Sequence, residues 1–267
     1  MTIAAPAREA VAITGLMEKA RVPRDAVVFV HSAFRGLSAQ GFRAEAFIEA
    51  LLDYMHPGTL IMPTMSWRSF RPALMAASPK PSFDELATPS HVGVIPEIFR
   101  LRYASRRSLH PTHSVAASGK LTDDLLSGHH LDDTPCSPNS PYGRARAQDA
   151  HIVMLGAGLE RCTAIHLAEE MVAPEIYLVP AAKAETIDCI DRHGNRYPVR
   201  LRRHLDLSRD FPRFAEPLAV RGKLRRGDLA GTSWLAMTQR DLLEEVCGAL
   251  ERDPRAIIAP PGMPKIP

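Results

Sequence analysis

Cysteine is scarce in this chain of 267 residues, and the few cysteines are scattered. There are four, Cys136, Cys162, Cys189 and Cys247, and no two of them form a CxxC pair. A disulfide framework needs dense, paired cysteines, and a zinc knuckle needs cysteines at close spacing. The sequence therefore argues against both, and it indicates a protein of a reducing compartment.

Long apolar runs and blocks of like charge are also lacking. No stretch approaches the roughly 20 apolar residues of a membrane span. Charged residues interrupt the N-terminal stretch where a signal peptide needs an apolar core. The net charge is only +3, which is too small to indicate nucleic acid as a partner. We therefore expect a cytoplasmic protein, with no nucleic-acid or membrane partner, that is a monomer or a homodimer.

The composition that remains is typical of a globular domain, with 45% apolar and 24% charged residues. Short apolar runs alternate with amphipathic segments, and a hairpin with a turn at 193–195 follows them. This alternation predicts one domain over residues 1–267 with a three-layer α/β/α fold, in which the hairpin makes the sheet mixed. Strands are predicted at 26–32, 58–67, 113–119 and 151–156, and helices at 7–20, 43–55, 92–103, 121–129, 163–172 and 238–253.

The segment TAIHLAEE, residues 163–170, holds the first candidate site. If Thr163 caps a helix, His166 lies in its first turn, and Glu169 and Glu170 follow on the same face. A carboxylate bonded to one ring nitrogen leaves the other nitrogen able to accept a proton. Two other interpretations stay open from the residues alone. The segment could be a solvated helix face, or Cys162 and His166 could form a nucleophile pair.

Two further segments carry polar side chains at places where ligands bind. VHSAFRGL, residues 30–37, ends a predicted strand in His31 and Ser32, although an ordinary turn explains this pattern equally well. In SRRSLHPTHSVA, residues 105–116, the arginines could contact phosphate groups. The side-chain hydroxyls of the same segment could hydrogen-bond an extended ligand. A metal site at His110 and His113 is weakly supported, because Pro111 disfavours a helix that would present both rings on one face.

The loop GAGLER, residues 156–161, imitates the start of a dinucleotide-binding fingerprint. It follows a predicted strand and precedes a predicted helix, and it contains Gly156 and Gly158. Arg161 stands where the third glycine of the fingerprint belongs. We therefore infer no dinucleotide site here.

Together these segments resemble the successive motifs of the aminoglycoside 3-N-acetyltransferase family. The similarity covers roughly residues 25–175 and is carried by motifs that occur in the family's order and spacing; the part after about residue 180 matches more loosely. The motifs are VHSAFRGL, GTLIMPTMSW, SFDELATPSHVGVIPEIFR, RSLHPTHSVAASG, SPNSPYGR and IVMLGAGLERCTAIHLAEE.

The resemblance implies a three-layer α/β fold that binds acetyl-coenzyme A and acetylates a small-molecule amine without a metal. It implies that His166 is the base and that Glu169 orients it. The Thr163 hydroxyl and nearby backbone amides are candidate donors to the oxyanion that would form. Attack on the thioester is expected to be direct, with no acyl-enzyme. The residues expected to bind the coenzyme are His31, Ser32, Ala33, Phe34, Arg35, Arg107, Ser108, His110, Thr112 and Ser114. Those expected to contact the amine are Trp67, Asp84, Tyr142, Glu170 and Asp206.

One segment departs from what a polycationic antibiotic requires. Residues 68–82 carry Arg68, Arg71 and Lys80, with no acid before Asp84. These charges would repel an aminoglycoside, so acetylation of a less cationic or phosphate-bearing amine is an alternative to antibiotic resistance. A coenzyme-binding module without turnover is a further alternative, against which the paired His166 and Glu169 argue.

Overall fold

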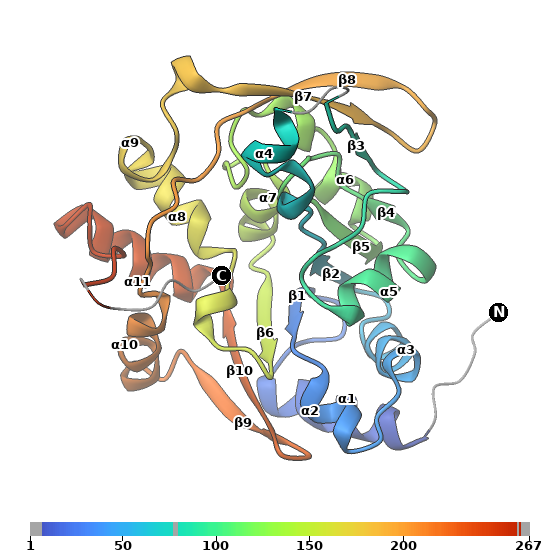
Figure 1. Cartoon of the computed structure of the whole chain (residues 1–267). Coiled ribbons are helices and arrows are strands. Elements are labelled where there is room, and N and C mark those ends of the chain that lie inside the picture. The colour runs from blue at the N-terminus through green and yellow to red at the C-terminus, as the bar shows by residue number, and fades with distance from the viewer. Residues whose placement is uncertain (1–6, 77–79, 261, 263–267) are drawn as a thin grey trace.

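A computed structural model describes residues 7–76, 80–260 and 262 of the chain. A seven-stranded sheet runs through the middle of the molecule, in the order β4–β5–β2–β1–β6–β10–β9 (Figure 1). Its strands are β1 (Val27–Ser32), β2 (Thr59–Pro63), β4 (Arg106–Arg107), β5 (Val115–Gly119), β6 (His151–Leu155), β9 (Arg225–Leu229) and β10 (Thr232–Thr238).

The sheet is mixed, as the sequence predicts, but for a different reason. Strand β1 lies between β2 and β6 and pairs in parallel with both, whereas every other pairing in this sheet is antiparallel. The predicted hairpin at 185–201 forms, but it belongs to a separate three-stranded sheet. The antiparallel part of the main sheet comes instead from β4, β5, β9 and β10.

Both faces of the main sheet are buried by helices, which gives the three predicted layers. Val27 and Phe29 of β1 point into one apolar cluster, and Val28 and Val30 point into the other. The two clusters gather the helices into two groups, one on each face of the sheet. The first group is α6 (Thr122–Leu126), α7 (Pro141–Ala147), α8 (Ile165–Val172), α10 (Ala215–Val220) and α11 (Gln239–Arg252); the second is α1 (Ala7–Ala20), α2 (Arg35–Ala39), α3 (Ala44–Tyr54) and α5 (Val94–Arg102). Figure 1 shows α8, α10 and α11 on one side of the central strands and α1, α3 and α5 on the other.

Local sequence explains where the helices begin. The Thr238 side chain accepts a hydrogen bond from the Asp241 amide and so caps α11. Helix α8 begins differently, because its N-cap residue is Ala164, with no side-chain cap. The prediction that Thr163 caps this helix is therefore wrong. His166 still lies in the first turn, as predicted.

The second sheet runs across the top of the molecule in Figure 1 and consists of β3 (Phe83–Asp84), β7 (Glu185–Ile190) and β8 (Arg196–Leu201). Gly194 takes a φ of 84° in the turn between β7 and β8, a conformation that favours glycine. The Asp191 carboxylate closes this turn by accepting hydrogen bonds from the amides of His193 and Asn195. Tight turn chemistry at 193–195 therefore produces the hairpin that the sequence predicts.

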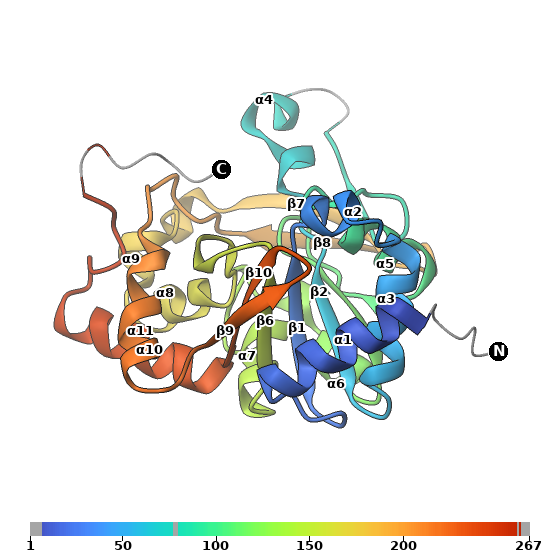
Figure 2. The same ribbon diagram turned by 90° about the horizontal axis from the view of Figure 1, so that it is seen from below.

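Short elements complete the fold. Helix α4 (Pro72–Met75) stands away from the body of the molecule in Figure 2, whereas α9 (Pro174–Tyr177) follows α8 directly. In the described part of the chain, no helix combines the length and apolarity that crossing a membrane requires. The described residues also form the 3-10 helices η1 (Trp67–Phe70), η2 (His129–Leu131), η3 (Leu159–Arg161), η4 (Ala181–Lys183) and η5 (Phe211–Phe214).

Candidate active site

A pocket of about 990 Å³ opens where the central strands end. Ser32 ends β1, Pro63 ends β2, and Ala157 follows β6; all three line the pocket. Parallel strands bring their carboxyl ends to one edge of a sheet, where α/β proteins bind ligands. The architecture therefore points to this pocket as the functional site.

His166 lies in the wall of the pocket and is held by a carboxylate. Its Nδ1 lies 2.8 Å from Glu169 Oε2. Because an ionised carboxylate only accepts hydrogen bonds, Nδ1 carries the proton that it donates to Glu169. Nε2 is then the nitrogen available to take a proton from a ligand.

Glu169 is fully buried, and Arg209 binds its carboxylate from the other side. Arg209 Nε lies 2.6 Å from Oε1, and Nη2 lies 3.2 Å from Oε2. Burial alone would raise the pKa of Glu169, but the charge and hydrogen bond of His166, followed by the charge of Arg209, lower it to about 2. Glu169 is therefore an anion at neutral pH and can hold the imidazole in one orientation.

Three more aromatic rings surround His166. His204 stacks on it with ring centroids 4.3 Å apart, and the edges of Phe211 and His113 approach at 5.3 and 6.1 Å. Burial, reinforced by the charges of neighbouring histidines, lowers the pKa of both His204 and His113 well below the usual value. These two rings are therefore neutral at pH 7, and they pack against His166 without competing for its proton.

Many of the predicted site residues line this pocket. His31 is one of them, and burial lowers its pKa to about 4, so its ring is neutral. Its Nε2 is buried and has no hydrogen-bond partner in the protein. The predicted residues in the lining are His31, Ser32, Ala33, Phe34, Arg35, Trp67, Thr112, Thr163, His166 and Asp206.

Arg107, expected to contact the coenzyme, is buried and bonded within the protein. Nε donates to Thr64 Oγ1 at 3.2 Å and to Ser114 Oγ at 3.0 Å, and Nη2 donates to the Thr64 carbonyl at 2.7 Å. Nη1 donates to the carbonyl of Thr88. Arg107 therefore ties the 107–114 segment to its neighbours, and neither Arg107 nor Ser114 is in the pocket lining.

Ser108 and His110, also expected to contact the coenzyme, are likewise bonded within the protein. The Ser108 hydroxyl accepts the Val115 amide at 2.9 Å and lies 2.9 Å from His129 Nδ1. His110 Nδ1 accepts the backbone amides of residues 112 and 113, at 3.3 and 3.0 Å. Both residues are buried outside the pocket lining. Within this motif, only Thr112 and His113 reach the pocket.

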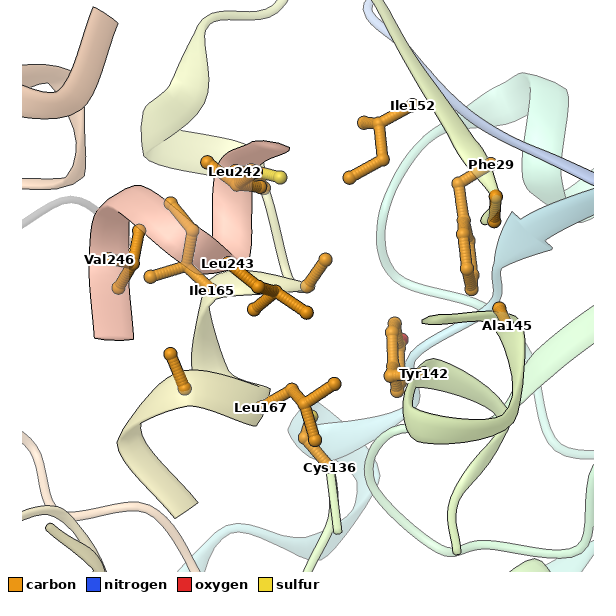
Figure 3. Packing of buried hydrophobic residues seen from close by; sticks show 14 of the residues in the cluster. Phe29, Cys136, Tyr142, Ala145, Ile152, Ile165, Leu167, Leu242, Leu243 and Val246 are labelled. Carbon is orange, nitrogen blue, oxygen red and sulfur yellow. The ribbon is translucent and has the colours of Figure 1, made fainter. Parts of the chain in front are cut away.

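Asp84 and Tyr142, predicted to contact the amine, also lie outside the pocket lining. Asp84 Oδ1 accepts the amides of Leu86 and Ala87, each at 2.8 Å, and so closes a local turn. Tyr142 is fully buried, and its ring stacks on that of Phe29 at 5.4 Å (Figure 3). The observed contacts of Asp84 and Tyr142 are therefore contacts within the fold.

Glu170 is the third predicted amine contact that lies outside the pocket lining. Its Oε1 accepts the Cys136 amide at 2.8 Å, and His204 Nε2 lies 2.9 Å from the same oxygen without hydrogen-bond geometry. Burial, opposed by a Thr134 hydroxyl and by the Cys136 amide, raises the pKa of Glu170 to about 7. Glu170 therefore belongs to a layer behind the pocket wall.

The structure disfavours the alternative of a Cys162–His166 nucleophile pair. Cys162 is fully buried and does not line the pocket. Burial raises the pKa of its thiol to about 12, against a smaller opposing effect of the amides of residues 164 and 165. A reactive cysteine must ionise near neutral pH. Cys162 is therefore a core residue.

The sequence does not reveal the side chains contributed by the segment after β8. His204, Arg209 and Phe211 contact His166 or its partner Glu169, and all three line the pocket. They lie about 40 residues beyond the recognised motif, in the part of the chain that matches the family pattern loosely. A charge pattern of Arg203, Asp206 and Arg209 was the signal available, and it has no fixed spacing that predicts a site.

Comparison with known proteins gives a consistent set of relatives. A family model described as aminoglycoside 3-N-acetyltransferase matches residues 29–251. Aminoglycoside N(3)-acetyltransferase IV of Salmonella sp is 30% identical over 239 residues, which is 88% of this chain and 84% of the relative.

Solved structures agree with this match. The structure of aminoglycoside acetyltransferase AAC(3)-IVa in complex with a gentamicin superposes with a TM-score of 0.76 at 27% identity, over 95% of this chain and 92% of the other. The AAC-IIIb structure with CoASH has a TM-score of 0.72 at 19% identity, over 91% of this chain and 95% of the other, and this second likeness concerns the fold alone.

Proposed function

Since the chain belongs to the aminoglycoside 3-N-acetyltransferase family and is therefore an acyltransferase, we propose that it moves an acetyl group from acetyl-coenzyme A to an amine of an aminoglycoside or a related amino sugar. The family includes a member that binds coenzyme A. The observation that carries the proposal is the His166–Glu169–Arg209 chain of contacts in the pocket wall, with Nε2 of His166 left for the substrate.

In this mechanism, His166 Nε2 accepts the proton that a substrate ammonium must lose before its nitrogen can attack. The nitrogen then attacks the thioester carbonyl, so that a carbon–nitrogen bond forms. The tetrahedral intermediate collapses by breaking the carbon–sulfur bond. The remaining excess proton of the nitrogen passes to the departing thiolate, which leaves as coenzyme A.

Thr163 is the proposed donor to the oxyanion of the intermediate. It lines the pocket three residues before His166, and its hydroxyl makes a long contact of 3.9 Å with Met65 Sδ. A hydrogen bond to sulfur is weak, so this hydroxyl can turn towards a developing negative oxygen at small cost. A charged acceptor binds a hydroxyl more strongly than a neutral thioether does.

Arg35 is the proposed contact for a coenzyme phosphate, in place of Arg107. It follows the end of β1, lines the pocket, and belongs to the motif that carries the family resemblance. Arg106, the other arginine of the SRRS segment, bonds Asp123 at 2.8 Å. An Arg35→Ala variant should bind coenzyme A roughly 10- to 150-fold more weakly, the loss typical of one charge-assisted contact. Arg106→Ala serves as the matched control.

The amine side of the pocket favours a substrate with few positive charges. Arg68 and Arg71 line it, with their guanidinium groups 5.1 and 5.8 Å from the centroid of the Trp67 ring. Glu160 and Asp206 are the acids in the described lining. A polycation would meet the two arginines, so a less cationic or phosphate-bearing amine is the second candidate acceptor.

A coenzyme A release assay with several amines tests the proposal. The panel contains gentamicin, apramycin, glucosamine and glucosamine 6-phosphate, and mass spectrometry identifies each product. We expect an N-acetylated product with at least one amino sugar, formed roughly 100-fold or more slowly by the His166→Ala variant. Hydrolysis of acetyl-coenzyme A without any acetylated amine, or equal turnover by His166→Ala, would contradict the proposal.

A further inference from the structure

Behind the wall of the pocket, three metal-ligand side chains from distant parts of the chain converge. Cys136 comes from the loop before α7, Glu170 from α8, and His204 from the segment after β8. One ligand atom from each lies within 4.8 Å of the other two. Cys136 and Glu170 are 34 positions apart in the sequence, as are Glu170 and His204. No short sequence motif therefore predicts this group.

The polar atoms of the group are poorly satisfied by the protein. Both ring nitrogens of His204 and the Oε2 atom of Glu170 are buried without a hydrogen-bond partner. Native proteins rarely leave buried polar atoms unpaired unless an ion, a water or a functional role accounts for them. Glu170 Oε2 and the unprotonated ring nitrogen of His204 therefore each offer an electron pair beside a buried thiol, and a metal ion accepts electron pairs.

From this convergence we propose that Cys136, Glu170 and His204 bind a zinc ion. Thiolate, carboxylate and imidazole are the ligands that zinc prefers, and a water would complete the tetrahedral coordination beside the three protein ligands. The sulfur selects zinc over magnesium or calcium, which take oxygen ligands. One thiolate, one carboxylate and a neutral imidazole balance the two positive charges of the ion. A neutral centre fits the surroundings of Cys136, which belongs to the apolar cluster of Figure 3.

The neighbouring combination of His166, Glu169 and His204 also has metal-ligand spacing, but it is a poorer site. Both oxygens of Glu169 are already bonded, to His166 and to Arg209. The guanidinium of Arg209 would also repel a cation held there. Glu170, which has one unpaired oxygen, is therefore the better ligand, and His166 stays available as the base.

Contacts around the three residues hold them in place for binding. The Cys136 amide donates to Glu170 Oε1 at 2.8 Å, which fixes the loop against α8. The preceding residue, Pro135, has its carbonyl 3.0 Å from His129 Nε2. A zinc ion would join the loop, α8 and the segment after β8, and it would fix His204 in its stack on His166. The proposed role is structural support of the pocket wall.

Metal content and cobalt spectroscopy test the site without reference to acetyl transfer. The tag-free chain is equilibrated with zinc, dialysed, and measured by inductively coupled plasma mass spectrometry. We expect one zinc per chain. After removal of zinc with a chelator, one equivalent of cobalt should give a thiolate-to-cobalt charge-transfer band. Cys136→Ser should abolish this band, and Cys162→Ser, which changes another buried cysteine, should retain it.

Two further measurements keep the test decisive if Cys136→Ser fails to fold. Glu170→Gln and His204→Gln should each weaken zinc binding by at least about 10-fold, since loss of even an outer partner typically costs 10- to 100-fold. X-ray absorption at the zinc edge of the unchanged chain should show one sulfur neighbour. Absence of stoichiometric zinc, absence of a sulfur neighbour, or a cobalt band that survives in folded Cys136→Ser would overturn the proposal.

Discussion

Glu169 and Glu170 are consecutive residues of α8, and both are buried, yet their surroundings differ in charge. The Glu169 carboxylate contacts His166 and Arg209, and the pKa of Glu169 falls to about 2. The Glu170 carboxylate lies beside the Cys136 thiol and the neutral imidazole of His204, and burial raises the pKa of Glu170 to about 7. Equal burial therefore gives opposite outcomes, because His166 and, to a smaller extent, Arg209 offset the desolvation of Glu169.

The difference suggests a division of labour between the two sides of the helix. Arg209 supplies a permanent positive charge beside Glu169, so the Glu169 carboxylate stays ionised and can orient His166. The Glu170 side has no such side chain, and the proposed zinc ion would supply the positive charge there. Four substitutions test this comparison, in order of their expected effect on turnover.

His166→Ala should have the largest effect, because it removes the proposed base. We expect turnover to fall by roughly 100-fold or more, with coenzyme affinity nearly unchanged in calorimetric titration. His130→Ala is a matched control, since His130 lies outside the pocket lining and should leave turnover intact. Near-normal turnover of His166→Ala would end the assignment of the base.

Glu169→Gln should lower turnover less, by roughly 10-fold, because the ring keeps a weaker partner. Its effect on stability follows from the pKa of Glu169, which lies below the ordinary 4.5 in the folded chain, at about 2. The stabilisation is therefore present above pH 4.5 and is lost as the pH falls towards 2. At about 1.4 kcal/mol per unit, it amounts to about 3 kcal/mol at pH 7.

Urea denaturation of the parent and of Glu169→Gln at pH 7 and at pH 3 measures this. The variant should be less stable at pH 7, and the gap should narrow at pH 3. The acidic limb of the pH–rate profile should also lie at lower pH in the variant than in the parent, because the imidazolium of His166 loses its anionic partner. A constant gap in stability would mean that Glu169 is not held as an anion.

Arg209→Met should have a smaller effect on turnover, a few-fold, because Arg209 acts on His166 only through Glu169. Loss of its charge should raise the pKa of Glu169 towards the ordinary value, so the acid-induced loss of stability should begin at a higher pH. Arg209→Lys should restore part of the shift, since it keeps the charge but not the two-pronged contact. If neither profile moves, Arg209 serves packing alone.

Glu170→Gln should change turnover least and should reverse the stability result. In chelator, the raised pKa of Glu170 means that the folded chain loses stability as the pH rises from 4.5 to about 7. The variant should lack this loss and be more stable than the parent at pH 8. Urea denaturation with chelator and with zinc measures it, and zinc should remove the loss in the parent. If the stability of the parent in chelator does not fall between pH 4.5 and about 7, the contrast between Glu169 and Glu170 is wrong.

The sequence predicts the central fold well, because strong local patterns specify it. The apolar run at 26–32 and the amphipathic segment at 43–55 became β1 and α3. The β9–β10 hairpin was missed, because β9 reads RRGDL and carries charge on an exposed edge strand. No periodicity distinguishes such a strand from a loop. Whether residues 1–267 form one domain stays a prediction, and part of the 68–82 segment lies outside the described residues.

The candidate site was predictable only where one motif holds its parts. His166 and Glu169 are three residues apart on one helix, so their contact follows from helix geometry. Arg107 is the opposite case. From the sequence, its guanidinium was expected to contact a phosphate, whereas in the structure it bonds Thr64 and Thr88. Those residues lie 43 and 19 positions away. Contacts at such distance come from packing, which local sequence does not encode.

The burial of Cys162 has a consequence for side reactions of acetyl-coenzyme A, the proposed acetyl donor. Acetyl-coenzyme A is a thioester, and an exposed thiolate near it would exchange with it and become S-acetylated. Cys162 lies in the chain next to Thr163 of the pocket wall, but it is fully buried, and its thiol has a pKa of about 12. The pocket can therefore hold a reactive thioester without self-acylation, and the released coenzyme thiol finds no partner there for a mixed disulfide.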